Sequence, residues 1–240
     1  WNVLNSKQYI SFMSWKRYVS VPDAKAIAKI DEMRQNKRFE NICNVIQYVL
    51  TYNNTVKVFA LQEVNSRLLQ LLHKKFNTET HKVIHSNDAV DDRVLIIDRR
   101  VNIVTQKEFG YNGVVYGNKN RSVLLASCEL DGAFFDIVNL HIHWNIPECQ
   151  LAGIAAIIEE NLVNDKYVLC GDFNNNIEQL DGFLNHFSCI TYEKLQSEES
   201  GYNVKLDKDD KIDHIMVSST IDPLLIQSKT ISKLAGKTIL

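Results

Sequence analysis

Apolar residues recur every three or four positions in the segments of the chain that we predict to be helical. The first helix is predicted over Arg38–Leu50, the second over Ser66–Phe76 and the third over Glu148–Leu162. The apolar stripe of the first helix consists of Phe39, Ile42, Cys43, Ile46 and Val49. This spacing indicates that a helix has one face to bury against another layer of the fold.

Short apolar runs rich in β-branched residues separate the predicted helices and indicate strands. The runs are Val56–Leu61, Val94–Ile97, Val101–Val104, Ser122–Ser127, Ala133–Leu140, Tyr167–Cys170 and Ile212–Val217. Because only three residues separate the second run from the third, we expect these two strands to form a hairpin. Strands that occur in pairs around single helices favour a layered α/β body over a doubly wound parallel sheet.

The composition is that of an ordinary globular protein, with 45% hydrophobic and 23% charged residues in a chain of 240. No linker, repeat or low-complexity tract divides the chain, so we expect one domain over residues 1–240. The longest apolar run, Leu151–Ile158, is far shorter than the roughly 20 residues that cross a bilayer, and no basic-then-apolar leader opens the chain. We therefore expect an intracellular protein, cytoplasmic or nuclear, without a membrane partner.

Charge and cysteine content argue against three further classes of protein. The formal net charge of −2 argues against binding nucleic acid by bulk positive charge, so any phosphate must be met by a local site. The five cysteines form no CxxC pair, which argues against a disulfide framework and against a structural zinc site.

Polar residues that can bind a metal or a phosphate stand at the ends of several predicted strands. Since strand ends at one rim of a sheet bring together residues that are distant in sequence, we expect such residues to converge. They are Asn2, Glu63, His141, Asp172, Asn174 and Asp213. Taken singly, each has an ordinary explanation as a helix charge, a turn former, a buried histidine or a frayed terminus.

Five segments resemble the endonuclease/exonuclease/phosphatase superfamily, which has the deoxyribonuclease-I-like fold. They are WN at the start, ALQEV at 60–64, VNLHIHW at 138–144, LCGDFN at 169–174 and KIDHIMVS at 211–218. Within that superfamily, the segment HIHWNIPECQ looks most like the cytoplasmic poly(A) deadenylases. The resemblance implies an α/β fold: a four-layer α-β-β-α sandwich of two mixed sheets flanked by helices.

The resemblance also implies a role for each residue at the strand ends. Glu63 matches the principal ligand of a divalent ion, usually Mg²⁺ and alternatively Mn²⁺, with Asn2 beside it. Asp172 matches the acid that orients or deprotonates the attacking water, and Asn174 matches the residue that holds that water or a phosphate oxygen. His141 matches the histidine that faces the scissile phosphate.

The resemblance extends to the second half of the chain. Asp213 resembles an acid that polarises another histidine near the end of the family's fold, and His143 and Trp144 are expected to contact substrate. The family closes with a Ser-Asp-His motif that does not occur before Leu240. We therefore expect the chain to lack part of the first strand and the final strand. His214 is expected to pack and not to replace the missing histidine, because neighbours on a strand point to opposite faces.

The leading functional prediction is a Mg²⁺-dependent phosphodiesterase that acts on nucleic acid, as a 3′-end ribonuclease of deadenylase type with single-stranded RNA as partner. Two other substrates fit the same site: damaged DNA, at an abasic site or a tyrosyl-DNA linkage, and a phosphoinositide. A third alternative, a catalytically inactive relative that binds nucleic acid or protein, follows from the missing Ser-Asp-His motif.

Overall fold

The computed structural model describes most of the chain. The described residues are 21–51, 54–87, 92–111, 121–143, 146–187 and 213–221, with short stretches at 190–191, 202–203, 208–209, 233–234 and 237–238. No helix in these segments is both long and apolar enough to cross a membrane.

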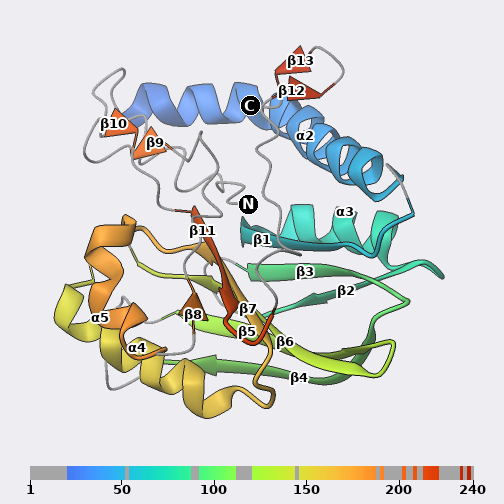
Figure 1. The fold of residues 1–240 in the computed structure, drawn as a ribbon. Coiled ribbons are helices and arrows are strands. Elements are labelled where there is room, and N and C mark those ends of the chain that lie inside the picture. Colours follow the sequence, from blue (N-terminus) through green and yellow to red (C-terminus); the bar gives the residue numbers. More distant parts are fainter. Residues whose placement is uncertain are drawn as a thin grey trace.

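The helices and sheets form four layers (Figure 1). A three-stranded antiparallel sheet has the order β1-β3-β2, with β1 at Val58–Val64, β3 at Asp92–Asp98 and β2 at His81–His85. Helices α2 (Val21–Thr51) and α3 (Ser66–Phe76) cover its outer face. These two layers make up one half of the sandwich.

The other half is a six-stranded sheet in the order β4-β5-β6-β7-β11-β8, covered by α4, η1 and α5. Its strands pair antiparallel except for β6 and β7, which run parallel, so this sheet is mixed. The strands are Asn102–Gly110, Ser122–Leu130, Ala133–His141, Tyr167–Asp172, Asp213–Ser218 and Ile190–Thr191, in the order given. The helices are Glu148–Asn161, Ile177–Leu180 and Asp181–Leu184, and two small pairs complete the strands: β9 (Tyr202–Asn203) with β10 (Lys208–Asp209), and β12 (Lys233–Leu234) with β13 (Lys237–Thr238).

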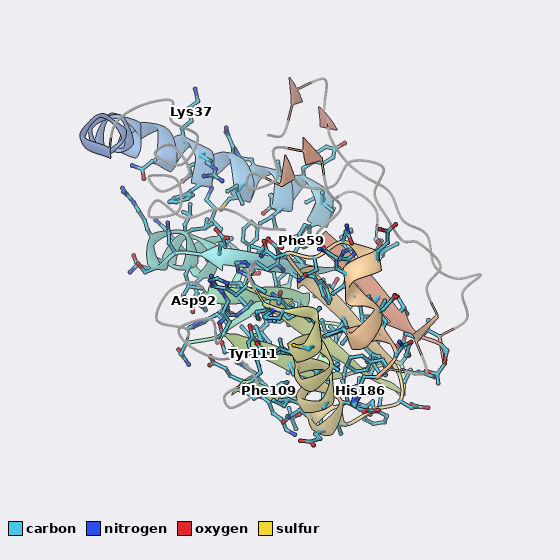
Figure 2. The ribbon with its side chains drawn as sticks, turned by 90° about the vertical axis from the view of Figure 1, so that its left-hand side faces the viewer. Lys37, Phe59, Asp92, Phe109, Tyr111 and His186 are labelled. Carbon is cyan, nitrogen blue, oxygen red and sulfur yellow. The ribbon has the colours of Figure 1, made fainter. Side chains whose placement is uncertain are left out.

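Alternating side chains of β3 divide the apolar interior into layers. Val94 and Ile96 pack against α2 and α3, whereas Leu95 and Ile97 pack against the six-stranded sheet. A third cluster lies between the six-stranded sheet and α4; Figure 2 shows Phe109 and Tyr111 beside that helix. Each of the three interfaces between layers thus has its own apolar core, and the predicted four-layer α/β sandwich is confirmed.

The predicted hairpin between Val94–Ile97 and Val101–Val104 is wrong. Strand β3 already has β1 on one edge and β2 on the other, so it has no edge left for β4. A tight turn, in which the Val101 amide donates to the Asp98 carbonyl at 3.0 Å, instead carries the chain from one sheet to the other. The true hairpin joins β5 to β6 through Asp131 and Gly132, both at positive φ.

Two of the helix predictions hold closely, and one helix is longer than predicted. Helix α3 has the predicted bounds and α4 ends one residue early, at Asn161. Helix α2 begins at Val21, well before the predicted start, in a segment that lacks a clear apolar stripe but is rich in good helix formers and has Pro22 in its first turn. The predicted stripe of α2 is buried apart from Val49, which is half-buried, and Leu50 completes it.

Candidate active site

A bulge in β1 positions the first acidic residue. Leu61 pairs with Val94 and Val64 pairs with Asp92, so Gln62 and Glu63 together oppose a single residue of β3. Glu63 has a φ of 58°, a conformation that costs a non-glycine residue roughly 1 kcal/mol or more. Bulges of this kind re-aim a side chain, and here the bulge lies at the end of the strand directly before α3.

The second and third residues come from the parallel strands of the larger sheet. His141 at the end of β6 is the direct partner of Asp172 at the end of β7. Gly171 lets these strand ends approach closely: its φ is 152°, and a Cβ there would lie 1.9 Å from the Leu140 carbonyl oxygen. The glycine of the GDFN segment is therefore required by backbone contact.

The turn after β7 is fixed by its own side chains. The backbone amide of Asn174 donates to Oδ1 of Asp172 at 2.8 Å, and Nδ2 of Asn174 donates to the Ile142 carbonyl at 2.8 Å. These bonds hold Asn174 at a φ of 52°. They also fix the direction of its amide, so the Oδ1 atom and the second N–H of Nδ2 are the groups that remain for a water or a phosphate oxygen.

Glu63, His141 and Asp172 meet where the two sheets come together. Nε2 of His141 lies 3.7 Å from Oε1 of Glu63 and 3.8 Å from Oδ2 of Asp172, and one ligand atom from each residue lies within 4.8 Å of the others. All three side chains are at most about 5% exposed. Two buried carboxylates at such a distance repel each other unless a cation lies between them, and oxygen-rich donor sets suit hard divalent ions. The three residues could therefore hold a metal ion.

The histidine of this cluster is held in its neutral form. Burial is the main cause that lowers the pKa of His141 well below its ordinary value, and the charges of Arg121 and Arg93 lower it further. Its Nδ1 atom is buried and has no hydrogen-bond partner among the described residues. A neutral imidazole keeps one lone pair and one N–H, so His141 can serve either a metal or a phosphate oxygen.

Two arginines beside the cluster were not predicted. Arg93 is fully buried on β3, opposite the bulge, and its guanidinium donates to the Ser122 hydroxyl at the start of β5. Arg121 directly precedes β5. The sequence analysis did not single out Arg93, because the apolar run that predicts this strand begins only at Val94, whereas β3 begins at Asp92.

The remaining predicted residues are only partly described. Asp213 is the direct partner of Asp172 on β11, so its backbone continues the row that begins at His141. His214 next to it is buried, with Nε2 at 2.9 Å from the Asn175 carbonyl and its ring edge-on to Phe173, so it packs as expected.

Three further residues were predicted to bind the substrate or the metal: His143, Trp144 and Asn2. His143 lies two residues beyond His141, is partly exposed and is near enough to influence the charge state of His141. Asn2 and Trp144 lie outside the described residues.

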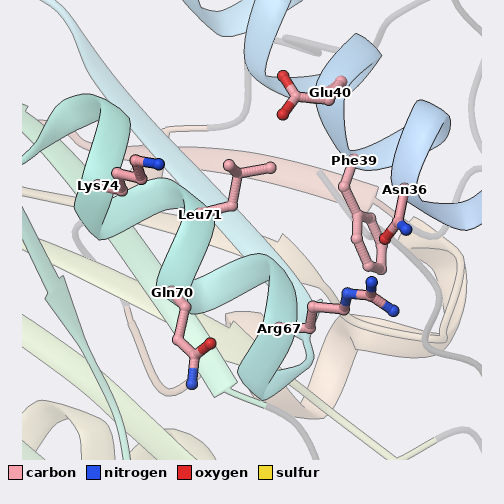
Figure 3. Close-up of a pocket in the computed structure, with 7 residues that line it drawn as sticks. All are labelled: Asn36, Phe39, Glu40, Arg67, Gln70, Leu71 and Lys74. Atoms are coloured by element: carbon pink, nitrogen blue, oxygen red, sulfur yellow. The ribbon is translucent and has the colours of Figure 1, made fainter.

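A separate pocket lies between α2 and α3, with a volume of about 290 Å³ (Figure 3). Arg67 and Lys74 of α3 face Phe39 and Glu40 of α2 across it. Glu40 forms an ion pair with Lys75 of the facing helix. All residues that line this pocket lie on α2 and α3. Glu63, His141 and Asp172 are not among them.

Comparison with solved structures identifies the fold. An endonuclease/exonuclease/phosphatase family protein from Bacteroides thetaiotaomicron superposes with a TM-score of 0.60 at 20% identity, over 78% of this chain and 76% of that one. D. rerio TDP2 complexed with a single-strand DNA product superposes with 0.57 at 17% identity, over 78% and 79%. The human Nocturnin catalytic domain with bound sulfate does so with 0.53 at 16%, over 75% and 74%.

Sequence comparison adds nothing to this result, since no protein-family model and no curated protein matches the chain. The structural likeness to these three proteins spans about three quarters of the chain. The resemblance inferred from the five sequence segments is thereby confirmed at the level of the fold. The chain has the fold of the endonuclease/exonuclease/phosphatase proteins.

Proposed function

We propose that the protein is a Mg²⁺-dependent phosphodiesterase that hydrolyses nucleic acid, and specifically a 3′-end ribonuclease of deadenylase type. One observation carries the proposal: Glu63, His141 and Asp172 from both sheets converge within 4.8 Å in a buried position. Structural stability does not require two carboxylates and a neutral imidazole to be clustered in one buried place. A site that binds a divalent cation and a phosphate does require such a cluster.

Glu63 is assigned to hold the divalent ion, Mg²⁺ or Mn²⁺, and the sequence resemblance assigns Asn2 to the same role. When bound, that ion supplies positive charge that offsets the charge of the phosphoryl oxygens. Asp172 accepts a proton from the attacking water, and Asn174 holds that water in line with the leaving oxygen. The water oxygen bonds to phosphorus, the bond from phosphorus to the 3′ oxygen of the preceding nucleotide breaks, and that oxygen takes a proton from solvent.

Other residues of the rim are assigned to the substrate. His141 donates its N–H to an oxygen of the scissile phosphate. Asp213, which pairs with Asp172 at the same rim, is assigned to polarise the further histidine that the family carries near the end of its fold. His143 and Trp144 contact the terminal nucleotide. The segment HIHWNIPECQ, which leads from β6 into α4, supports RNA with a 3′ adenosine tail as the substrate.

A DNA phosphodiester is the second candidate substrate, because one structure of the same fold, D. rerio TDP2, was solved with a single-strand DNA product. Both candidates share a single-stranded end. Unpaired bases can stack on side chains without the cost of a few kcal/mol that unstacking a duplex requires. A near-neutral chain also fits a local site better than a long duplex contact.

The deciding experiment compares four substrates with the full-length protein, with Mg²⁺ and with EDTA. They are an oligo(A)-tailed RNA, an abasic DNA duplex, a 5′-tyrosyl single-stranded DNA and a soluble phosphoinositide. We expect the tailed RNA to be shortened from its 3′ end only with Mg²⁺. A tenfold preference for any other substrate rejects the deadenylase assignment, and no hydrolysis of any substrate indicates an inactive binding relative.

A further inference from the structure

We infer that Asn139, together with Gln62, is a positioning residue that fixes the two sheets at the spacing the candidate site needs. This inference rests on the proposed metal site and not on the choice of substrate. Asn139 lies on β6, two residues before His141, and Gln62 directly precedes Glu63 on β1. The pair therefore joins the two strands that supply opposite sides of the site.

Asn139 makes three contacts across the interface between the sheets. Its Nδ2 donates to the Leu61 carbonyl at 3.1 Å and to the Val94 carbonyl at 3.0 Å. Its Oδ1 accepts from Nε2 of Gln62 at 2.7 Å. Both side chains are fully buried. The contacts tie one residue of the larger sheet to two of the three strands of the smaller sheet, β1 and β3.

The acceptors are the two residues that pair immediately before the β1 bulge. A bulge disrupts the ladder locally, so the backbone there has fewer partners from its own sheet. Asn139 supplies a donor to each strand at that point. The bulge that holds Glu63 at positive φ is therefore stabilised by hydrogen bonds from the neighbouring sheet.

The amide of Asn139 meets the three partners with the donors and the acceptor that they need. Turning the amide over would place its oxygen against two carbonyl oxygens, so its orientation is fixed. Aspartate would present acceptors to both carbonyls, and leucine would leave both carbonyls and Gln62 without the bond from this side chain. The three bonds therefore tie β6 to the strands on both sides of the bulge.

Further polar contacts between the sheets lie at the site end of the interface. Arg93, opposite the bulge, donates to the Ser122 hydroxyl at the start of β5, and Nε2 of His141 faces Oε1 of Glu63. Elsewhere the facing layers contain apolar residues such as Leu95, Ile97 and Ala126. Apolar packing would stabilise this interface equally well, but it does not fix a distance, whereas directional hydrogen bonds do.

The test uses the full-length protein and two readouts besides activity. Mn²⁺ binding is measured by electron paramagnetic resonance, and amide hydrogen exchange at residues 61–64 is measured without metal. We expect Asn139→Leu to weaken Mn²⁺ binding by about 10- to 100-fold, as loss of an outer partner of a metal ligand does, and to speed the exchange at 61–64 at least tenfold. Ile137→Ala, a control in the same strand and the same interface, should leave both within about twofold.

Each possible outcome decides a defined claim. A folded Asn139→Leu protein with unchanged exchange and unchanged Mn²⁺ binding overturns the inference, and so does an equal loss in Ile137→Ala. If Asn139→Leu does not fold, Gln62→Leu removes one of the three contacts and should weaken Mn²⁺ binding several-fold; no change there also overturns it. If the unsubstituted protein does not bind Mn²⁺, the proposed metal site fails, and hydrogen exchange alone decides the role of Asn139.

Discussion

The carboxylates at the two ends of the three-stranded sheet have different neighbours. At one end, Asp98 receives the guanidinium of Arg100, with Nε at 3.0 and 3.1 Å from its two oxygens. Arg100 also donates to the carbonyls of Asn54 and Thr55, so the charge pair joins two loops. At the other end, Oε1 of Glu63 and Oδ2 of Asp172, which comes from the larger sheet, stand 3.7 and 3.8 Å from Nε2 of His141, beyond hydrogen-bonding distance.

The pKa values express the same contrast. Hydrogen bonds from Arg100 are the main cause that lowers the pKa of Asp98, so the ionised carboxylate is stabilised by the fold itself. Burial is the main cause that lowers the pKa of His141, so its imidazole stays neutral. Two buried carboxylates and this imidazole, with one ligand atom of each within 4.8 Å of the others, form a donor set that suits a divalent cation.

Removing a charge at the site end should have the largest effect. We expect Glu63→Gln to lower Mg²⁺-dependent turnover by about three orders of magnitude or more, because it removes a charged ligand from the proposed metal site. The exposed Glu79→Gln is the matched control and should keep full turnover. Circular dichroism and thermal unfolding check that both variants fold. Normal turnover by Glu63→Gln would remove Glu63 from the site.

How much of this contrast could be predicted depends on how local each feature is. Glu63, His141 and Asp172 were predicted to converge because each stands at the end of an apolar run, and a strand end is a local signal. The bulge that aims Glu63 has no such signal, since its extra residue is defined only by pairing with β3. The sequence therefore predicted which residues gather, and not how they are held.

The errors have the same origin. The three residues between two apolar runs predicted a hairpin. Whether adjacent strands pair depends on which edges other strands occupy, and both edges of β3 are paired with other strands. The buried Arg93 and the contacts of Asn139 were missed because both are relations between the two sheets. The DG dipeptide at 131–132 was a usable local signal for the true hairpin between β5 and β6.

The close approach of β6 and β7 gives the next largest effect. We expect Gly171→Ala to destabilise the protein by roughly 3 kcal/mol or more, because its Cβ would meet the Leu140 backbone at 1.9 Å. Gly132→Ala is the matched control: that glycine also has positive φ, 80°, but a Cβ there meets nothing within 4 Å. The control should lose only about 1 kcal/mol. Equal losses in urea unfolding would mean that conformation, and not contact, makes Gly171 necessary.

A divalent ion should stabilise one end of the sheet and not the other. We expect Mn²⁺ at a hundred times its dissociation constant to raise the free energy of unfolding by about 2.7 kcal/mol. Asp172→Asn should abolish this gain, and Asp98→Asn should retain it, since Asp98 is bound by Arg100 instead. Thermal unfolding with and without the ion measures both. Loss of the gain in Asp98→Asn would show that the two ends do not differ in the way their contacts indicate.

The smallest expected effect is the pH dependence of the Asp98 end. The pKa of Asp98 is lowered in the folded protein, so the unfolded chain binds more protons between its ordinary value of about 3.9 and the lowered one. The stabilisation is therefore fully present above about pH 4 and is lost as the pH falls through the lowered pKa. Asp98→Asn should reduce stability at pH 7 by about 1 kcal/mol or less, because Arg100 is half exposed and water screens the pair. Urea unfolding at pH 7 and at pH 3 measures this: the difference in the free energy of unfolding between the two proteins should be smaller at pH 3. If the difference grows on acidification, a group other than Asp98 causes the loss of stability at low pH.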